Sequence, residues 1–169
     1  MHCAIPRHSN YDVIIIGARC AGAATAMLLA RAGLRVLAID RSPYGSDTLS
    51  THALMRPSVL QLSRWGLMER LRAGGTPPAT KTVFHYGRDE VAVTIEPRDG
   101  VDALYAPRRS LLDRLLVDAA RAAGAEICHG PQLVGLNRAD SGSVTGVRIR
   151  CAERGQISIA TPLVVGADR

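Results

Sequence analysis

The sequence contains few aromatic residues and almost no lysine. One Trp, one Phe and four Tyr occur in 169 residues, and 20 of the 21 basic residues are Arg. These arginines are scattered, with only Arg108 and Arg109 adjacent. A nucleic-acid-binding surface needs clustered basic residues, and single strands are held by stacking on aromatic side chains. We therefore expect the net charge of +6 to form a solvated basic surface that binds no nucleic acid.

Long apolar runs and metal-ligand patterns are also absent. No apolar stretch approaches the about 20 residues of a membrane-spanning helix, and residues 1–10 lack the apolar core of a secretory signal. The cysteines show neither a C-x-x-C pattern nor metal-ligand spacing; they are Cys3, Cys20, Cys128 and Cys151. These absences predict a cytoplasmic protein with reduced cysteines, no bound metal and no membrane span.

Residues 11–40 carry the strongest pattern in the chain. Residues 13–16 form an apolar β-branched run, which is typical of a parallel strand buried on both faces. Small and apolar residues then recur at helical spacing over residues 21–32. A second apolar run, residues 34–39, ends on the acid Asp40. The segment therefore predicts a βαβ unit of a Rossmann-like α/β fold.

The turn and the final acid of this unit predict the chemistry. Gly17 permits a tight strand-to-helix turn, and Gly22, which has no Cβ, lets the helix pack closely on the strand. The helix N-terminus then directs N–H groups and a positive dipole end at a pyrophosphate. Asp40 follows at about the 20-residue spacing of a carboxylate that binds an adenosine ribose and disfavours a 2′-phosphate. The alternative is a plain α/β crossover that ends on an acid by chance.

Arg19 departs from the pattern, because it occupies the place of the middle glycine in Gly17-Ala18-Arg19-Cys20-Ala21-Gly22. That glycine normally allows the backbone to approach the phosphates. An arginine fits if its φ is negative and its side chain turns outward. We therefore expect the Arg19 side chain to point toward the phosphates or solvent, where its guanidinium can bind a phosphate oxygen.

The remaining chain does not continue the β-α-β-α order of an NAD-linked dehydrogenase. Pro, Gly and Asp mark residues 41–50 as a loop. The periodicity then predicts helices from about Pro57 to Gly66 and from Leu67, followed by a hairpin of residues 82–86 and 91–95 around a turn at 87–90. Next come a short strand at 103–105, a helix at 109–123 and a strand at 125–128. An antiparallel meander of 133–137, 144–150 and 156–160 precedes a last buried strand, which begins at 163 and ends on Asp168.

The chain resembles the N-terminal part of FAD-dependent oxidoreductases of the p-hydroxybenzoate hydroxylase type, which include aromatic monooxygenases and geranylgeranyl-reductase-like enzymes. The similar stretches are VIIIGARCAG with Asp40, RRSLLDRLLVDAARAAGAE, QLVGL…SVTGVRI and LVVGAD. The resemblance covers nearly the whole chain. It implies that residues 1–169 are the N-terminal portion of an FAD-binding domain that contains inserted helices and an antiparallel meander.

The resemblance implies a set of cofactor-binding residues. The set is Gly17, Ala18, Arg19, Cys20, Ala21, Gly22, Asp40, Arg41, Arg109, Leu133 and Asp168. The glycine-rich turn would face the FAD pyrophosphate and Asp40 the adenosine ribose. Arg109 would reach the ribityl or phosphate region, although a surface position is the alternative. The Leu133 backbone would contact the adenine. Asp168 would be the acid of an Asp-Gly motif, in which Arg169 replaces the glycine, or would simply end a strand.

The expected function is that of an FAD enzyme reduced by NAD(P)H, acting on a small molecule as a monooxygenase or a reductase. An NAD-linked dehydrogenase and a nucleotide-binding module without turnover are the alternatives. No residue is assigned a catalytic role, since His52, beside Ser50 and Thr51, equally suits a helix start and the remaining histidines form no constellation. Such enzymes complete the flavin site with a later glycine–aspartate motif. We therefore expect this chain alone to bind flavin weakly, to lack turnover and to self-associate.

Overall fold

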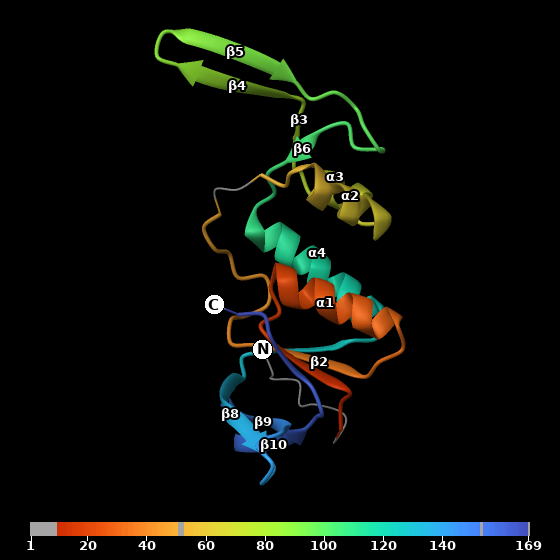
Figure 1. The fold of residues 1–169 in the computed structure, drawn as a ribbon, viewed down its shortest axis with the longest axis vertical. Coiled ribbons are helices and arrows are strands. Elements are labelled where there is room, and N and C mark those ends of the chain that lie inside the picture. The colour runs from red at the N-terminus through yellow and green to blue at the C-terminus, as the bar shows by residue number, and fades with distance from the viewer. Residues whose placement is uncertain (1–9, 51–52, 153, 169) are drawn as a thin grey trace. The chain divides into compact units, whose positions relative to one another are not determined.

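The structure is a computed structural model that describes residues 10–50, 53–152 and 154–168. The chain divides into two units (Figure 1). The first consists of Met1–Ser46 and Leu116–Arg169, and the second of Asp47–Leu115. Thr51, His52 and Arg169 lie outside the described residues, as does Cys3.

A four-stranded parallel sheet forms the centre of the first unit. Its strands lie in the order β11 (Val164–Gly166), β1 (Val13–Ile16), β2 (Val36–Asp40) and β7 (Glu126–His129). Ile14 of β1 is in register with Val164 of β11 and with Leu37 of β2. Every residue of β1 and β2 is buried, which explains their unbroken apolar sequence. The predicted Rossmann-like α/β fold is confirmed.

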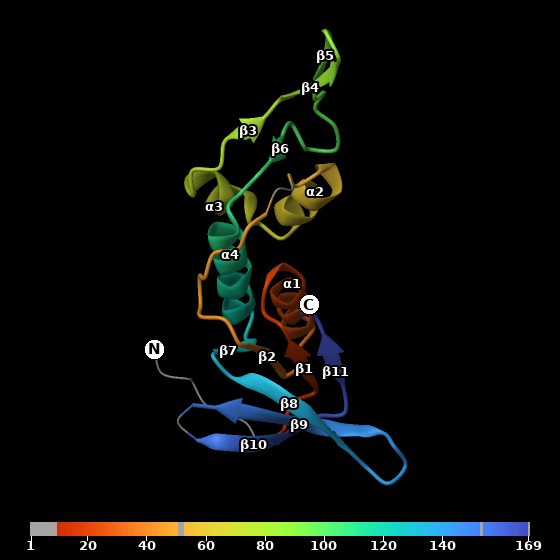
Figure 2. The same ribbon diagram turned by 90° about the vertical axis from the view of Figure 1, so that its left-hand side faces the viewer.

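Two layers cover this sheet on opposite faces (Figure 2). Helix α1 (Cys20–Arg31) and the part of α4 (Arg109–Ala122) that belongs to this unit lie on one face. The predicted meander, β8 (Gln132–Arg138), β9 (Val144–Cys151) and β10 (Gly155–Ala160), is an antiparallel sheet on the other. A core cluster joins the two sheets, because Ile14 and Leu37 pack with Val147 and Ile149.

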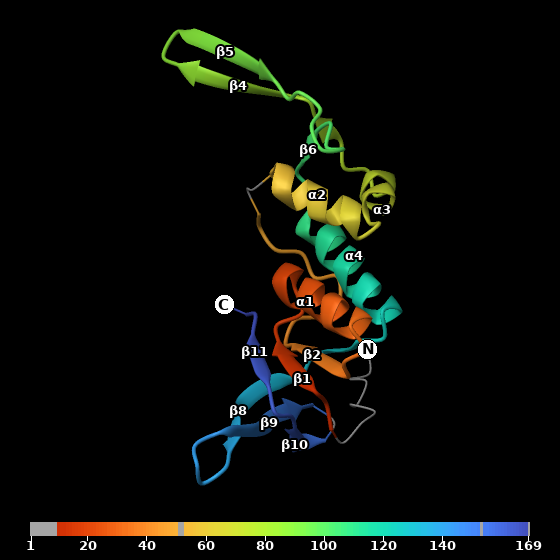
Figure 3. The same ribbon diagram turned by 45° about the vertical axis from the view of Figure 1, so that its right-hand side comes forward.

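Glycine determines how closely α1 approaches β1 (Figure 3). A Cβ on Gly22 would lie 1.8 Å from the Gly17 carbonyl oxygen, far inside van der Waals contact. The other buried residues of this helix are Ala23, Ala26 and Met27, so its sheet-facing side is mostly small. Gly33 follows the helix with φ +86°, as expected of a helix-ending glycine.

The second unit combines helices and short strands. These elements are α2 (Arg56–Arg64), α3 (Met68–Ala73), β3 (Pro78–Ala79), β4 (Lys81–Tyr86), β5 (Asp89–Thr94), β6 (Leu104–Tyr105) and the start of α4. The Arg56 guanidinium ties a loop of this unit together by donating to the Glu96 carbonyl at 2.8 Å and the Val101 carbonyl at 2.9 Å. No helix in the described part of the chain is long and apolar enough to span a membrane.

Two details of the second unit differ from the sequence prediction. The β4–β5 turn is shorter than residues 87–90, because Asp89 pairs with Tyr86 and only Gly87 and Arg88 remain between the strands. A two-residue turn matches the twist of paired strands when glycine supplies a positive φ, here +66°. The sequence does not predict strand β3, because proline usually interrupts regular secondary structure. Pro78 and Ala79 nevertheless pair with Tyr105 and Leu104 of β6.

The close approach of α1 to β1 makes a testable prediction. Gly22→Ala should lower the free energy of unfolding by about 1–3 kcal/mol, because the new methyl group forces α1 away from the turn. Gly166→Ala is the matched control, since a Cβ there meets nothing within 4 Å. Urea unfolding of both variants measures the difference, and equal stability of the two would refute a tight helix–strand contact.

Candidate functional site

Three strands of the parallel sheet end side by side at one edge of the first unit. The Gly17 N–H donates to the Ile39 carbonyl and the Ala167 N–H to the Ile16 carbonyl, both at 2.7 Å. Gly17 has φ +98°, and a Cβ on it would lie 2.8 Å from the Asp168 nitrogen. Only glycine therefore allows the chain after β11 to pass beside the turn after β1.

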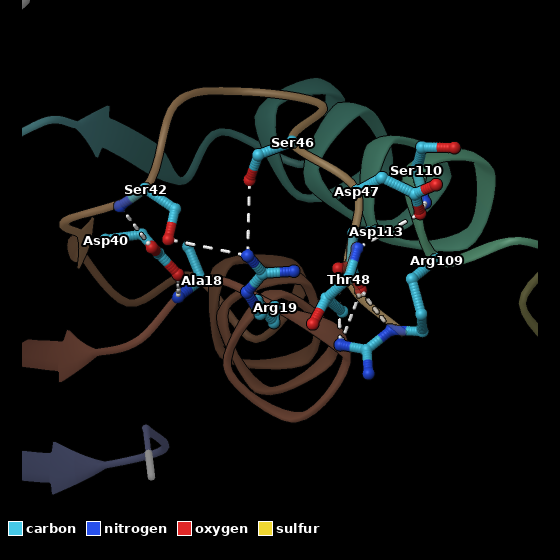
Figure 4. Close-up of polar contacts among 10 residues, drawn as sticks. All are labelled: Ala18, Arg19, Asp40, Ser42, Ser46, Asp47, Thr48, Arg109, Ser110 and Asp113. Atoms are coloured by element: carbon cyan, nitrogen blue, oxygen red, sulfur yellow. Dashed lines mark hydrogen bonds and ion pairs between the residues drawn. The ribbon is translucent and has the colours of Figure 1, made fainter. Parts of the chain in front are cut away.

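The Asp40 carboxylate links this turn to the end of β2. Its Oδ2 accepts the Ala18 N–H at 2.9 Å, and its Oδ1 accepts the Ser42 N–H at 2.8 Å (Figure 4). The side chain is only 7% exposed. A carboxylate offers about four lone-pair sites. Asp40 thus holds the site together and retains acceptor capacity for further donors.

Arg19 adopts ordinary extended backbone angles, with φ −84° and ψ −161°. The predicted avoidance of positive φ is confirmed. Its guanidinium donates to the hydroxyls of Ser46 at 3.2 Å and Ser42 at 3.4 Å (Figure 4). The side chain is therefore directed along the loop that follows β2 rather than extended into solvent, and it places a positive charge beside the glycine-rich turn.

The N-terminus of α1 suits an anion. Its N-cap residue, Arg19, makes no side-chain capping bond, and its first turn contains no acid. The first N–H groups of a helix have no intrahelical acceptor and carry the positive end of the dipole. Cys20 is partly exposed, Ala21 is exposed and Gly22 is buried. A phosphate group placed here would meet positive partial charges from the helix and a full charge from the arginine.

The other predicted site residues of the first unit lie in different surroundings. Arg41 is exposed at the end of β2, and Asp168 is exposed beside the Gly17 turn. Leu133 belongs to β8, and its side chain packs against the core cluster, which leaves its backbone as the group predicted to contact an adenine. The roles predicted for these residues toward a cofactor stay predictions.

Arg109 belongs to the second unit, at the start of α4. Its guanidinium forms an ion pair with Asp113 at 3.1 Å, one helical turn along. Asp47 also binds this helix start, accepting the Ser110 N–H at 3.2 Å and pairing with Arg108. These two donors hold the pKa of Asp47 below its ordinary value. Asp47 therefore caps α4 from a distant loop, and contact between Arg109 and a cofactor stays a prediction.

Sequence reasoning missed three residues at this edge. Ser42 and Ser46 hold the Arg19 guanidinium, and His129 contacts the Ser42 carbonyl through Nδ1 at 3.0 Å. Sequence patterns gave His129 no role, and the pairing of β2 with β7 places it beside Asp40. Its position at the end of an apolar strand was the available sequence signal.

A sequence profile for the FAD binding domain matches residues 10–168. The chain belongs to this family of FAD-binding domains. It is 30% identical over 144 residues to the probable electron transfer flavoprotein-quinone oxidoreductase YdiS of Escherichia coli, covering 82% of this chain and 33% of that protein. It is 28% identical over 176 residues to the aklavinone 12-hydroxylase RdmE of Streptomyces purpurascens, covering 93% and 32%.

Solved structures of FAD-dependent enzymes share the fold of this FAD-binding domain. The myxobacterial chondrochloren halogenase CndH superposes with a TM-score of 0.80 at 20% identity, over 94% of this chain and 37% of that one. The chain spans about a third of the length of these two curated relatives. The family match confirms the resemblance to FAD-dependent oxidoreductases and supports FAD as the cofactor.

The bonds of Asp40 and Arg19 predict different effects on stability. Asp40→Ala should lower the free energy of unfolding by about 1–3 kcal/mol, because it removes the acceptor of the buried Ala18 N–H. Arg19→Gly should change it by less than about 0.5 kcal/mol, since glycine is a good N-cap and the two serine bonds are long. Urea unfolding measures both, and an equal loss in the two variants would contradict this assignment.

Proposed function

We propose that this FAD-binding domain holds the adenosine half of FAD at the Gly17–Asp40 edge, as part of an oxidoreductase reduced by NAD(P)H. The observation that carries the proposal is the uncapped N-terminus of α1 lying between the glycine turn and the Asp40 carboxylate. The substrate would be a small molecule. A cytoplasmic location fits a reaction that uses NAD(P)H.

Each group at this edge suits one part of the cofactor. The N–H groups of the first α1 turn and the Arg19 guanidinium would bind the pyrophosphate. Asp40 already accepts two backbone N–H groups and has lone pairs left for the ribose hydroxyls. A negative group there repels a 2′-phosphate, which favours FAD over a phosphorylated dinucleotide. The backbone of Ala167 and Asp168 would lie beside the same pyrophosphate.

When bound, FAD supplies the redox chemistry through its isoalloxazine ring, while protein groups bind and orient it. The relatives support two reaction classes, since one is named a quinone oxidoreductase and the other a hydroxylase. Reduction of a double bond or ring and hydroxylation with O₂ are therefore the two activities proposed for the whole protein. The family assignment favours both over an NAD-linked dehydrogenase.

The second candidate is nucleotide binding without turnover by this stretch of chain. It needs only the groups that lie together at the Gly17–Asp40 edge. The two candidates share the adenosine site and differ in one measurement, the oxidation of NAD(P)H by the chain in the presence of FAD and O₂.

The adenosine site predicts how an Asp40 variant binds nucleotide. Asp40→Asn should weaken the affinity for ADP-ribose and FAD by the about 1.5–3 kcal/mol of a charge-assisted hydrogen bond, because one ribose acceptor is lost. Asp89→Asn, on the exposed hairpin strand β5, removes the same charge elsewhere and should leave the affinity unchanged. Calorimetric titration measures both. Unchanged affinity in Asp40→Asn would remove Asp40 from the site.

A further inference from the structure

The loop that leaves β2, residues 41–46, is held by four elements of the first unit. Asp40 of β2 binds the Ser42 N–H, and Arg19 at the start of α1 binds the hydroxyls of Ser42 and Ser46. His129 at the end of β7 contacts the Ser42 carbonyl. Helix α4 holds Tyr44 through Asp118. The proposed adenosine site adjoins this loop, so whatever fixes the loop also shapes the site.

Tyr44 is fixed from α4 and from β7. Its hydroxyl donates to Asp118 Oδ1 at 2.7 Å, and the Arg121 guanidinium lies 5.1 Å from its ring centroid. The His129 ring meets the Tyr44 ring edge-on, with centroids 5.6 Å apart. Arg121 also donates to the Ile127 carbonyl of β7 at 3.2 Å. The imidazole of His129 is thereby packed between the loop and its own strand.

The hydrogen bond of His129 determines its tautomer. A carbonyl oxygen only accepts, so Nδ1 must carry the proton that binds the Ser42 oxygen. In the neutral ring Nε2 is then an acceptor. Nε2 is buried and has no hydrogen-bond partner among the described residues. A second proton on Nε2 would be enclosed without an acceptor, which is costly in a buried site.

The surrounding charges act on His129 in both directions. Burial has the largest effect and lowers its pKa, and the positive charges of Arg121 and Arg19 lower it further. The Ser42 carbonyl and the Asp40 carboxylate raise it, but the net shift is downward from the ordinary value of 6.5. The surroundings therefore favour the neutral form of His129 in the folded protein.

We propose that His129 is a positioning residue whose neutral side chain holds residues 41–46 in the shape that receives the adenosine half of the cofactor. Protonation of Nε2 requires an acceptor, and this buried atom meets water only if the loop moves away. The Ser42 contacts of Asp40 and Arg19 then shift with the loop. The inference rests on the proposed adenosine site and adds to it a residue that opens this site in acid.

The sign of the pH effect follows from this geometry. Because the bound form favours neutral His129, affinity is complete above the pKa of His129 in the free chain, which lies below its ordinary value, and falls as the pH drops below that pKa. A competing effect has the opposite sign, since a positive imidazole near the pyrophosphate would strengthen binding in acid. Because a protonated Nε2 has no acceptor while the loop stays in place, we expect the loss of affinity to dominate.

Calorimetric titration with ADP-ribose tests the proposal between about pH 5 and 8, a range in which its pyrophosphate does not titrate. The affinity of the wild-type chain should fall toward acid, by at most about tenfold per pH unit for one proton. His129→Asn keeps an N–H donor near the Nδ1 position but cannot titrate. The affinity of this variant for ADP-ribose should be near that of the wild type at high pH and should not change as the pH falls. His85→Asn, which removes an exposed histidine paired with Glu90, should keep the wild-type profile.

Nuclear magnetic resonance titration of His129 in the wild-type chain gives an answer that needs no variant. Its pKa should be lower with saturating ADP-ribose than without. A pKa raised by the ligand, or a pH profile that survives in His129→Asn, would overturn the inference while leaving the adenosine site intact. Absence of ADP-ribose binding to the wild type at every pH would instead refute the proposed function, and the inference with it.

Discussion

The carboxylate of Asp40 is the contact on which this edge of the molecule depends. It binds the turn after β1 through the Ala18 N–H and the loop after β2 through the Ser42 N–H, and it is buried while doing so. An unpaired buried carboxylate would be unfavourable, so these two donors keep the group in place. They also align the α1 N-terminus, the Arg19 guanidinium and the acid on one side of the sheet edge. The proposed nucleotide site is therefore organised before any ligand binds.

Local patterns predict most of the elements, because the buried strands, the glycine turn and the amphipathic α4 each carry their signal in adjacent residues. The Arg19 backbone was predicted for the same reason, since sterics alone restrict φ. Pairings between distant segments were not predictable in this way. His129 lies beside Asp40 only because β7 pairs with β2. The strand at Pro78 forms because β6 supplies its pairing partner. The predicted cofactor roles of Arg109 and Leu133 depend on contacts of the same distant kind.

Membership in the FAD-binding domain family and the geometry of the edge support the same reading from independent directions. The family identifies the cofactor as FAD, and the geometry of the edge supports the role proposed for each neighbouring group. An arginine in the middle-glycine position does not disturb the turn, because its side chain is drawn along the loop by two serine hydroxyls. The departure from the usual glycine pattern thus adds a positive charge at the place where a pyrophosphate would lie.

Amide chemical-shift mapping of the isotopically labelled chain with ADP-ribose tests the central claim most directly. The account predicts the largest changes at the amides of Ala18, Gly22 and Ser42, with the hairpin of β4 and β5 unchanged. Saturable shifts confined to other parts of the chain, with the Ala18 and Ser42 amides unmoved, would contradict the assignment of the adenosine site.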